Sequence, residues 1–277
     1  MLYRVFDGHC DTPVELWLQE KQLRSSDLAV SLDKAAGLGG YAQFFAFCTA
    51  WIETRMPHTE HFSRALDYFL AQLRKNEDRI TLCRTAPEAE AAMQAGECAA
   101  FLAIEGAEAV REDEGLLELA YEAGVRMVSL VWNLPNGLSG SCQTGEGLTE
   151  KGKRFFRRAQ KLGMLVDVSH LSEKGFWDMA ELAEKPIVAS HSDSFAVCPH
   201  PRNLTDAQFQ AICDLGGEGH LALGADLDGC SVLPEGFAAL NDYETLGRYL
   251  ADAGYPDETI QNLFCNSLMK VVKTCIM

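Results

Sequence analysis

The sequence predicts an α/β fold built from parallel strands, either a (β/α)8 TIM-like barrel or a doubly wound sheet. Two observations lead to this prediction. Short apolar runs, typical of strands buried on both faces, alternate with helical patterns along the chain. The connections between the two kinds of segment are short. No glycine-rich phosphate-binding pattern follows any of the runs, so the sequence gives no support for nucleotide binding.

Seven apolar runs are the expected strands. They lie at 3–9, 41–49, 99–105, 125–132, 164–170, 186–191 and 220–226. A complete barrel has eight strand-helix units. Between His191 and His220 the chain has room for only one loop and one helix before the glycine-rich stretch 215–219. We therefore expect a barrel from which strand 7 and its helix are missing.

Helical patterns separate these runs. The expected helices lie at 61–79, 88–95, 114–123, 149–162, 172–183, 205–213, 241–253 and 257–273. The first has an apolar stripe that includes Phe62 and Phe69. Thr149 and Ser172 are suitable N-caps, and Gly163 is a suitable stop. The eight segments therefore carry the signals that start, orient and end helices.

Length and composition favour one folded domain. The chain has 277 residues, of which 47% are hydrophobic, and it contains no repeat, linker or low-complexity segment. We expect a single barrel domain over residues 1–277, closed by C-terminal helices.

Charge and cysteine content limit the partners and the compartment. The formal net charge is −16, which argues against nucleic acid as a partner. No apolar stretch approaches the about 20 residues of a membrane span, so no membrane partner is expected. The ten cysteines include no CxxC pair, and no secretory leader pattern begins the chain. We expect a cytoplasmic protein with reduced thiols.

Five of the apolar runs end in residues that can bind a divalent metal. These residues are His9 and Asp11, Glu105, His170, His191 and Asp226. The first two share a strand face because residues i and i+2 point the same way. Each residue alone has a simpler explanation, such as a helix cap, turn chemistry or a satisfied histidine. Together they predict a metal site at the C-terminal rim of a barrel. His58, His61, His200 and His220 lack this placement and are expected not to be ligands.

Seven short motifs, in order along nearly the whole chain, resemble the membrane (renal) dipeptidase family, the M19 zinc metallopeptidases of the amidohydrolase superfamily. They are Asp7-Gly8-His9-Cys10-Asp11-Thr12-Pro13, Gln43-Phe44-Phe45, Ile104-Glu105-Gly106, Asp167-Val168-Ser169-His170, Ser190-His191-Ser192, Pro201-Arg202-Asn203-Leu204 and Gly224-Ala225-Asp226-Leu227-Asp228-Gly229. The resemblance implies a distorted barrel of the metallo-dependent hydrolase type, a homodimer and two Zn²⁺ per chain. It also implies hydrolysis of the amide bond of dipeptides, including those with a C-terminal D-residue, by a hydroxide that bridges the metals.

The resemblance also assigns roles to individual residues. His9, Asp11 and Asp226 would bind one zinc, His170 and His191 would bind the other, and Glu105 would bridge the two. Asp226 would also transfer protons. Arg202 would bind the terminal carboxylate of the substrate, which a guanidinium group suits.

Two departures from the family leave alternatives open. Trp132 occupies the position of a substrate-contacting histidine in mammalian members, so Trp132 and Asn133 either line the substrate pocket or simply pack. Three explanations of the missing seventh unit remain open. Either the unit is absent only from the recorded sequence, or it is a true deletion that neighbouring elements or a partner subunit repair. The third explanation is a damaged, inactive paralogue that still binds metal. A related amidohydrolase acting on N-acyl amino acids, lactams or lactones is the other alternative.

Overall fold

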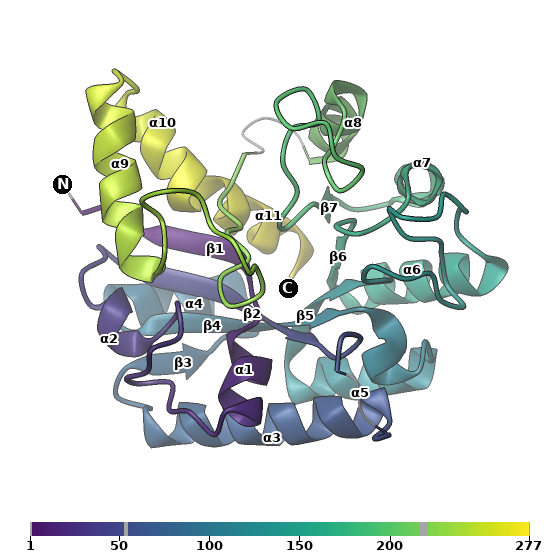
Figure 1. The fold of residues 1–277 in the computed structure, drawn as a ribbon, viewed down its shortest axis with the longest axis horizontal. Helices are drawn as coiled ribbons and strands as arrows, with labels where there is room; N and C mark the ends of the chain where they lie inside the picture. Colours follow the sequence, from purple (N-terminus) through teal and green to yellow (C-terminus); the bar gives the residue numbers. More distant parts are fainter. Residues whose placement is uncertain (1, 53–54, 217–220, 277) are drawn as a thin grey trace.

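The computed structural model describes residues 2–52, 55–216 and 221–276. Its centre is a curved parallel sheet with the strand order β1-β2-β4-β5-β6-β7, and β3 pairs with β4 beside this path (Figure 1). The strands are β1 (Val5–Cys10), β2 (Tyr41–Cys48), β3 (Ile80–Leu82), β4 (Cys98–Glu105), β5 (Val125–Ser129), β6 (Leu165–Asp167) and β7 (Ile187–Val188). The expected α/β fold of parallel strands and helices is confirmed.

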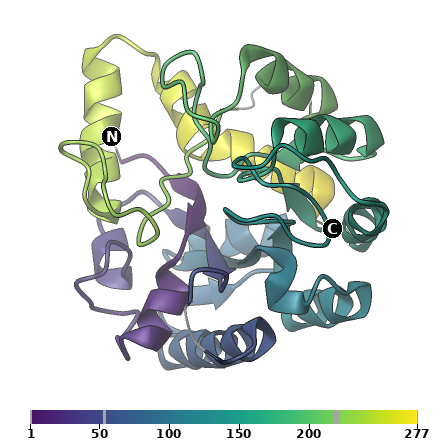
Figure 2. The same ribbon diagram turned by 45° about the vertical axis from the view of Figure 1, so that its right-hand side comes forward.

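Helices cover both faces of the sheet. They are α1 (Thr12–Leu18), α2 (Leu32–Ala35), α3 (His58–Lys75), α4 (Ala86–Gln94), α5 (Glu114–Ala123), α6 (Glu150–Leu162), α7 (Glu173–Leu182), α8 (Asp206–Gly216), α9 (Tyr243–Asp252), α10 (Asp257–Gln261) and α11 (Ser267–Cys275). Figure 2 shows the C-terminal helices, drawn in yellow, running from α9 across the molecule toward the strands. No helix within the described residues is long and apolar enough to cross a lipid bilayer.

The core explains why the strand sequences are almost continuously apolar. All eight residues of β2 and all eight of β4 are buried. On one side, Phe6, Phe44 and Phe101 of three adjacent strands stack with ring centroids 5.1–5.6 Å apart, in a cluster that also contains residues of α4 and α11. On the other side, residues of α3 such as Phe69 pack against Phe45 and Phe47. The strands are therefore buried on both faces, as parallel strands usually are.

Several element predictions need correction. Two further elements lie outside the predicted set: β3, which has only three residues, and α1, which has seven. So does the four-residue α2. The last expected helix is divided, because a π-helical turn at Asn262–Asn266 joins α10 to α11.

The expected strand at 220–226 is only partly formed. Residue 220 lies outside the described residues. From Leu221 onward the segment runs parallel to β1 through two isolated bridges, Asp7 with Leu223 and Cys10 with Leu227. Two backbone hydrogen bonds accompany them, from Gly8 N to Leu223 O at 2.8 Å and from Asp11 N to Leu227 O at 3.0 Å. Residues 221–227, called the Asp226 segment below, are thus fixed to β1 without forming a regular ladder.

The seventh unit has no counterpart between β7 and the Asp226 segment. There the described residues form loops and α8 and no ladder strand. The two edges nevertheless meet at the rim, where a Cβ atom built on Gly224 would lie 1.6 Å from the Ser190 carbonyl oxygen. Below this contact lies a cavity of about 100 Å³ lined mainly by apolar side chains, including Val188, Phe209 and Leu223. Glycine 224 therefore allows the rim to close where a strand is missing.

Candidate metal centre

The structure brings together the six candidate ligands. His9 and Asp11 end β1, Glu105 ends β4, His170 and His191 follow β6 and β7, and Asp226 lies on the segment beside β1. The C-terminal ends of parallel strands meet at one edge, so residues far apart in sequence converge. Five of the six side chains are almost completely buried, and that of Asp226 is 24% exposed.

Glu105 lies between two groups of these residues. Its Oε1 is 2.8 Å from His170 Nε2 and 3.2 Å from His191 Nε2. Its Oε2 is 3.4 Å from His9 Nε2, which in turn is 3.7 Å from Asp11 Oδ2 and 3.7 Å from Asp226 Oδ1. One carboxylate therefore faces both groups, one oxygen toward each.

The donor atoms fit divalent cations. His9 Nδ1 and Asp11 Oδ1 are buried atoms for which no hydrogen-bond partner is found. Burying such polar atoms without a partner is unfavourable. His170 Nε2 and His191 Nε2 are only 2.9 Å apart, so their lone pairs would repel unless a proton or a cation lay between them. Imidazole nitrogens together with carboxylate oxygens are the ligands that Zn²⁺ prefers among the non-sulfur donors.

Neighbouring groups fix which nitrogen of each histidine faces Glu105. His170 Nδ1 lies 2.9 Å from Asn133 Oδ1, an acceptor. His191 Nδ1 lies 2.7 Å from Ser190 Oγ, and that hydroxyl donates to Asp167. Both rings can therefore carry their proton on Nδ1 and leave Nε2 free to bind a cation.

The sequence reading did not assign these orienting roles. Asn133 is predicted either to line the substrate pocket or to pack. It lines the cavity described below, and its amide oxygen also contacts His170. Asp167 and Ser190 were quoted only as parts of motifs. The signal for them was their position at the ends of neighbouring strands, with Asp167 three residues before His170 and Ser190 directly before His191.

The site is electrostatically prepared for positive charge. Burial alone would raise the pKa of Glu105, but the charge of His9 and hydrogen bonds from His170, His191 and His9 outweigh it, and the pKa lies well below its ordinary value. Burial and the nearby charge of Glu105 raise the pKa of Asp11 to about 7. Burial and the neighbouring His9 lower the pKa of His191 to about 4. A neutral His191 next to the ionised Glu105 carboxylate is the arrangement that metal binding requires.

Asp226 is held in an unusual backbone conformation. Its φ is +52°, and that of Asp228 is +66°. Cys230 Sγ donates to Asp226 Oδ2 at 2.9 Å. A Cβ atom on Gly229 would lie 2.1 Å from Asp11 Oδ2 and 2.3 Å from Asp226 Oδ1. The sequence reading took this stretch only as a motif, and the structure shows that the glycine allows two candidate ligands to approach the backbone.

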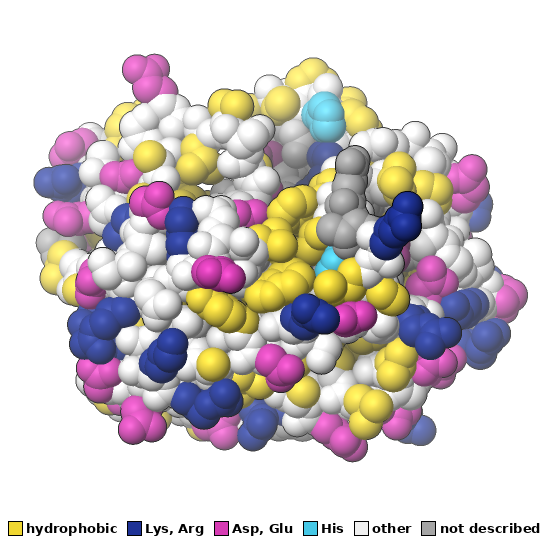
Figure 3. Space-filling view, turned by 60° about the horizontal axis from the view of Figure 1, so that its bottom comes forward, with side chains coloured by type: hydrophobic (Ala, Val, Ile, Leu, Met, Phe, Trp, Pro, Cys, Tyr) yellow, Lys and Arg dark blue, Asp and Glu magenta, His cyan; other side chains and the backbone are white. Residues whose placement is uncertain are grey.

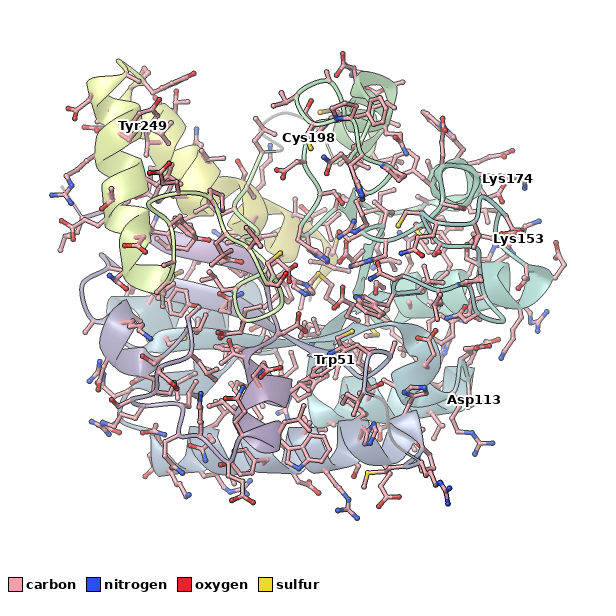
Figure 4. All side chains as sticks on the ribbon, in the orientation of Figure 1. Trp51, Asp113, Lys153, Lys174, Cys198 and Tyr249 are labelled. Atoms are coloured by element: carbon pink, nitrogen blue, oxygen red, sulfur yellow. The ribbon has the colours of Figure 1, made fainter. Side chains whose placement is uncertain are left out.

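A cavity of about 1670 Å³ opens beside the metal centre. Its lining includes five of the six candidate ligands, all but His9, together with Trp132, Asn133 and Arg202. Trp51, on the segment after β2, and Tyr249, on α9, lie on different parts of its wall (Figure 4). On the face drawn in Figure 3, apolar side chains gather near the centre, and lysine and arginine side chains are interspersed with acidic ones.

Arg202 and Trp132, two of the three predicted substrate residues, lie beside the metal centre. Arg202 Nη2 is 3.2 Å from His170 Nε2 and 3.3 Å from the His191 carbonyl oxygen, and Nη1 is 3.2 Å from Ser192 Oγ. The ring centroid of Trp132 lies 6.1 Å from that of His170. A guanidinium group at the wall of the cavity can bind an anionic group of a ligand.

The remaining histidines differ in their surroundings. His58 Nδ1 lies 3.1 Å from the Thr49 carbonyl oxygen, and the His61 ring lies 5.8 Å from that of Trp17. His200 lines the cavity but belongs to none of the candidate ligand groups found among the described residues. His220 lies outside the described residues.

The chain is similar to known proteins in sequence and in fold. The profile of the family described as "Membrane dipeptidase (Peptidase family M19)" matches residues 2–217. A protein of Acinetobacter calcoaceticus, "Uncharacterized protein in PQQ-III 3'region", is 32% identical over 249 residues, which cover 77% of this chain and 78% of that protein.

Two solved structures are similar over almost their entire length. A metallo peptidase from Rhodobacter sphaeroides, liganded with a phosphinate mimic of the dipeptide L-Ala-D-Ala, superposes with a TM-score of 0.89 at 26% identity, covering 99% of this chain and 100% of that chain. The dipeptidase AC, a metallo peptidase of family M19, superposes with a TM-score of 0.88 at 27% identity, covering 100% and 99%.

Proposed function

The chain belongs to the membrane dipeptidase family, peptidase family M19, and from this membership together with the geometry of the metal centre we propose that it hydrolyses the amide bond of dipeptides with two bound zinc ions. It is a hydrolase of the metallo-dipeptidase type. The observation that carries the proposal is the position of Glu105, with one carboxylate oxygen facing each of two groups of buried ligand atoms.

The residues divide into two metal positions that share Glu105. His9, Asp11 and Asp226 would hold one ion, and His170 and His191 would hold the other. When bound, such a pair supplies an activated water molecule and polarises the scissile carbonyl group. The protein contributes the fixed ligand geometry, because Asn133 orients His170 and the Asp167–Ser190 pair orients His191.

Asp226 is suited to proton transfer. Its side chain is partly exposed, lines the cavity and lies at the edge of the otherwise buried ligand group. A carboxylate in this position can accept a proton from the attacking water and deliver it to the leaving amine. Asp226 would thus serve both as ligand and as general base and acid.

Arg202 would fix the substrate by its terminal carboxylate. The phosphinate mimic in the Rhodobacter sphaeroides relative imitates a dipeptide whose second residue has the D configuration. We propose that the present chain also binds dipeptides of this configuration, and we expect L,D dipeptides to be hydrolysed as well as L,L dipeptides.

A substrate panel with metal analysis tests the proposal. The zinc-supplemented protein is assayed with L,L and L,D dipeptides, N-acyl amino acids, lactams and lactones, and its metal content is measured in the same preparation. We expect two zinc ions per chain and turnover of dipeptides above the other classes. Turnover of another class alone would favour a related amidohydrolase, and a folded, metal-loaded protein without any turnover would favour an inactive relative.

A further inference from the structure

The Asp226 segment has hydrogen-bonded strand contacts on only one side. Among the described residues its backbone bridges are to β1, through Asp7 and Cys10. On the side facing β7 it has the close contact of Gly224 with Ser190 and, below it, the cavity of about 100 Å³. A segment that carries a functional carboxylate is therefore fixed by fewer strand contacts than the other rim residues.

Asp7 supplies an additional attachment from inside the sheet. This residue of β1 is completely buried. Its Oδ2 accepts hydrogen bonds from the backbone N–H of Ala225, at 3.3 Å, and from the hydroxyl of Tyr243. Its Oδ1 accepts from the backbone N–H of His9, at 2.8 Å, and from Gln43 Nε2, at 3.3 Å. One carboxylate thus joins β1, β2, the Asp226 segment and α9.

Tyr243 connects this carboxylate to the wall of the cavity. It is the first residue of α9, is 1% exposed, and its ring packs against Phe237 and Phe264 at centroid distances of 4.9 and 5.9 Å. Leu246 and Tyr249 of the same helix line the cavity. Burial first, and then the neighbouring Asp7 carboxylate, raise the pKa of Tyr243 well above its ordinary value, so the phenol remains a donor.

The backbone of the segment needs such attachment. Asp226 and Asp228 both have φ in the left-handed region, which persists only where surrounding contacts impose it. At the far end, Asp228 Oδ2 accepts from Thr12 Oγ1 at 2.7 Å and Oδ1 accepts from the Ala29 N–H at 2.6 Å. On the other side of Asp226, the Asp7 carboxylate plays the same part, because it accepts a hydrogen bond from the Ala225 N–H.

We propose that Asp7 and Tyr243 form a positioning pair that holds the Asp226 segment against β1 and thereby sets the metal position formed by His9, Asp11 and Asp226. This inference rests on the proposed binuclear function. Tyr243 itself would contact neither substrate nor metal. The pair acts through Ala225, the residue before Asp226.

Tyr243→Phe in the zinc-loaded full-length protein tests the pair, because it removes one hydroxyl and keeps the ring. We expect one of the two zinc ions to bind about 10- to 100-fold more weakly in a chelator titration, while the other is unchanged. We also expect kcat for a dipeptide to fall with little change in KM, because Arg202 is untouched, and amide hydrogen exchange to become faster in 221–228.

Tyr41→Phe is the matched control. Tyr41 is also a buried phenol of this network, but its hydroxyl donates to Gln43 Oε1, at 2.6 Å, on the β2 side. We expect this variant to retain both zinc affinities and the wild-type exchange rate in 221–228. Asp7→Asn should reproduce the Tyr243→Phe pattern, and the double variant should be less than additive.

Two results would overturn the inference. One is an unchanged exchange rate in 221–228 of Tyr243→Phe, and the other is an equal weakening of both zinc ions. The exchange comparison is also made between the metal-free forms of the wild type and Tyr243→Phe, where it requires neither bound metal nor turnover. It therefore tests whether Asp7 and Tyr243 hold the segment even if the wild-type protein binds fewer than two zinc ions or hydrolyses no dipeptide. Those two results would contradict the proposed function and not the positioning pair.

Discussion

Glu105 is the residue that the two proposed metal positions share. Replacing it by glutamine keeps the shape of the side chain and removes the charge that both groups of ligands share. We expect Glu105→Gln to lower dipeptide turnover by about 100-fold or more and to weaken metal binding, as measured by kinetics and metal analysis. Glu108→Gln, three residues along the chain and outside the ligand groups, should have a much smaller effect. Equal losses in the two variants would contradict a bridging role.

Arg202 can be tested with substrates that differ only at the terminal carboxylate. The wild-type protein should hydrolyse a dipeptide much better than its C-terminal amide. Arg202→Ala should raise KM for the free dipeptide by about 10- to 100-fold, because a charge-assisted hydrogen bond is lost. It should leave the amide almost unaffected. A variant that still distinguishes the two substrates as the wild type does would show that another group binds the carboxylate.

Asp11 determines a pH dependence of the metal-free protein. Its pKa is raised to about 7 in the folded protein from an ordinary 3.8, so between these values the folded state binds a proton that the unfolded state does not. Its contribution to stability is therefore present below about pH 4 and is lost as the pH rises to about 7. Comparing urea unfolding of wild-type and Asp11→Asn protein from pH 4 to 8 isolates this contribution, because the asparagine does not titrate. A stability difference that does not change with pH would contradict it.

At the scale of elements, the closed rim depends on the contact between the Asp226 segment and the residues after β7. Gly224→Ala would place a Cβ atom on the Ser190 carbonyl oxygen, so one of the two edges must move. We expect a loss of about 1–3 kcal/mol of stability in urea unfolding, together with weaker metal binding. Gly37→Ala is the control, since a Cβ atom there has no neighbour within 4 Å. Similar stabilities of the two variants would show that the edges are not in tight contact.

The same elements show how far the sequence could be read. The positions of β2, β4 and α5 followed from long apolar runs and clear helix signals, and Glu105 could be placed at a strand end for that reason. Short elements such as β3 carry too few residues for a periodic pattern. The Asp226 segment is hydrogen-bonded through Ala225 to Asp7, which lies 218 positions away along the chain. Local sequence does not encode such a contact. The orienting role of Asn133 was missed for the same reason, because its contact with His170 spans 37 positions.

At the scale of the whole molecule, the metal centre spans the place where the sheet lacks a unit. His191 follows β7, Asp226 lies on the opposite edge, and Glu105 comes from the middle of the sheet. Bound metals would therefore join the two edges that no described strand connects. Ligands that bind only the folded state stabilise it, by about 2.7 kcal/mol at a free concentration 100 times the dissociation constant.

Metal removal should consequently loosen the molecule unevenly. We expect chelation to lower the unfolding temperature and to accelerate amide hydrogen exchange most in 187–192 and 221–228, the two edges of the gap. Exchange in β2 and β4, whose eight-residue ladder is buried throughout, should change little. Re-addition of zinc should restore both measurements. Equal acceleration of amide hydrogen exchange over all strands would mean that the metals stabilise the fold without joining its open edges. The contact of Gly224 with Ser190 at the rim would then be the main closure of the barrel.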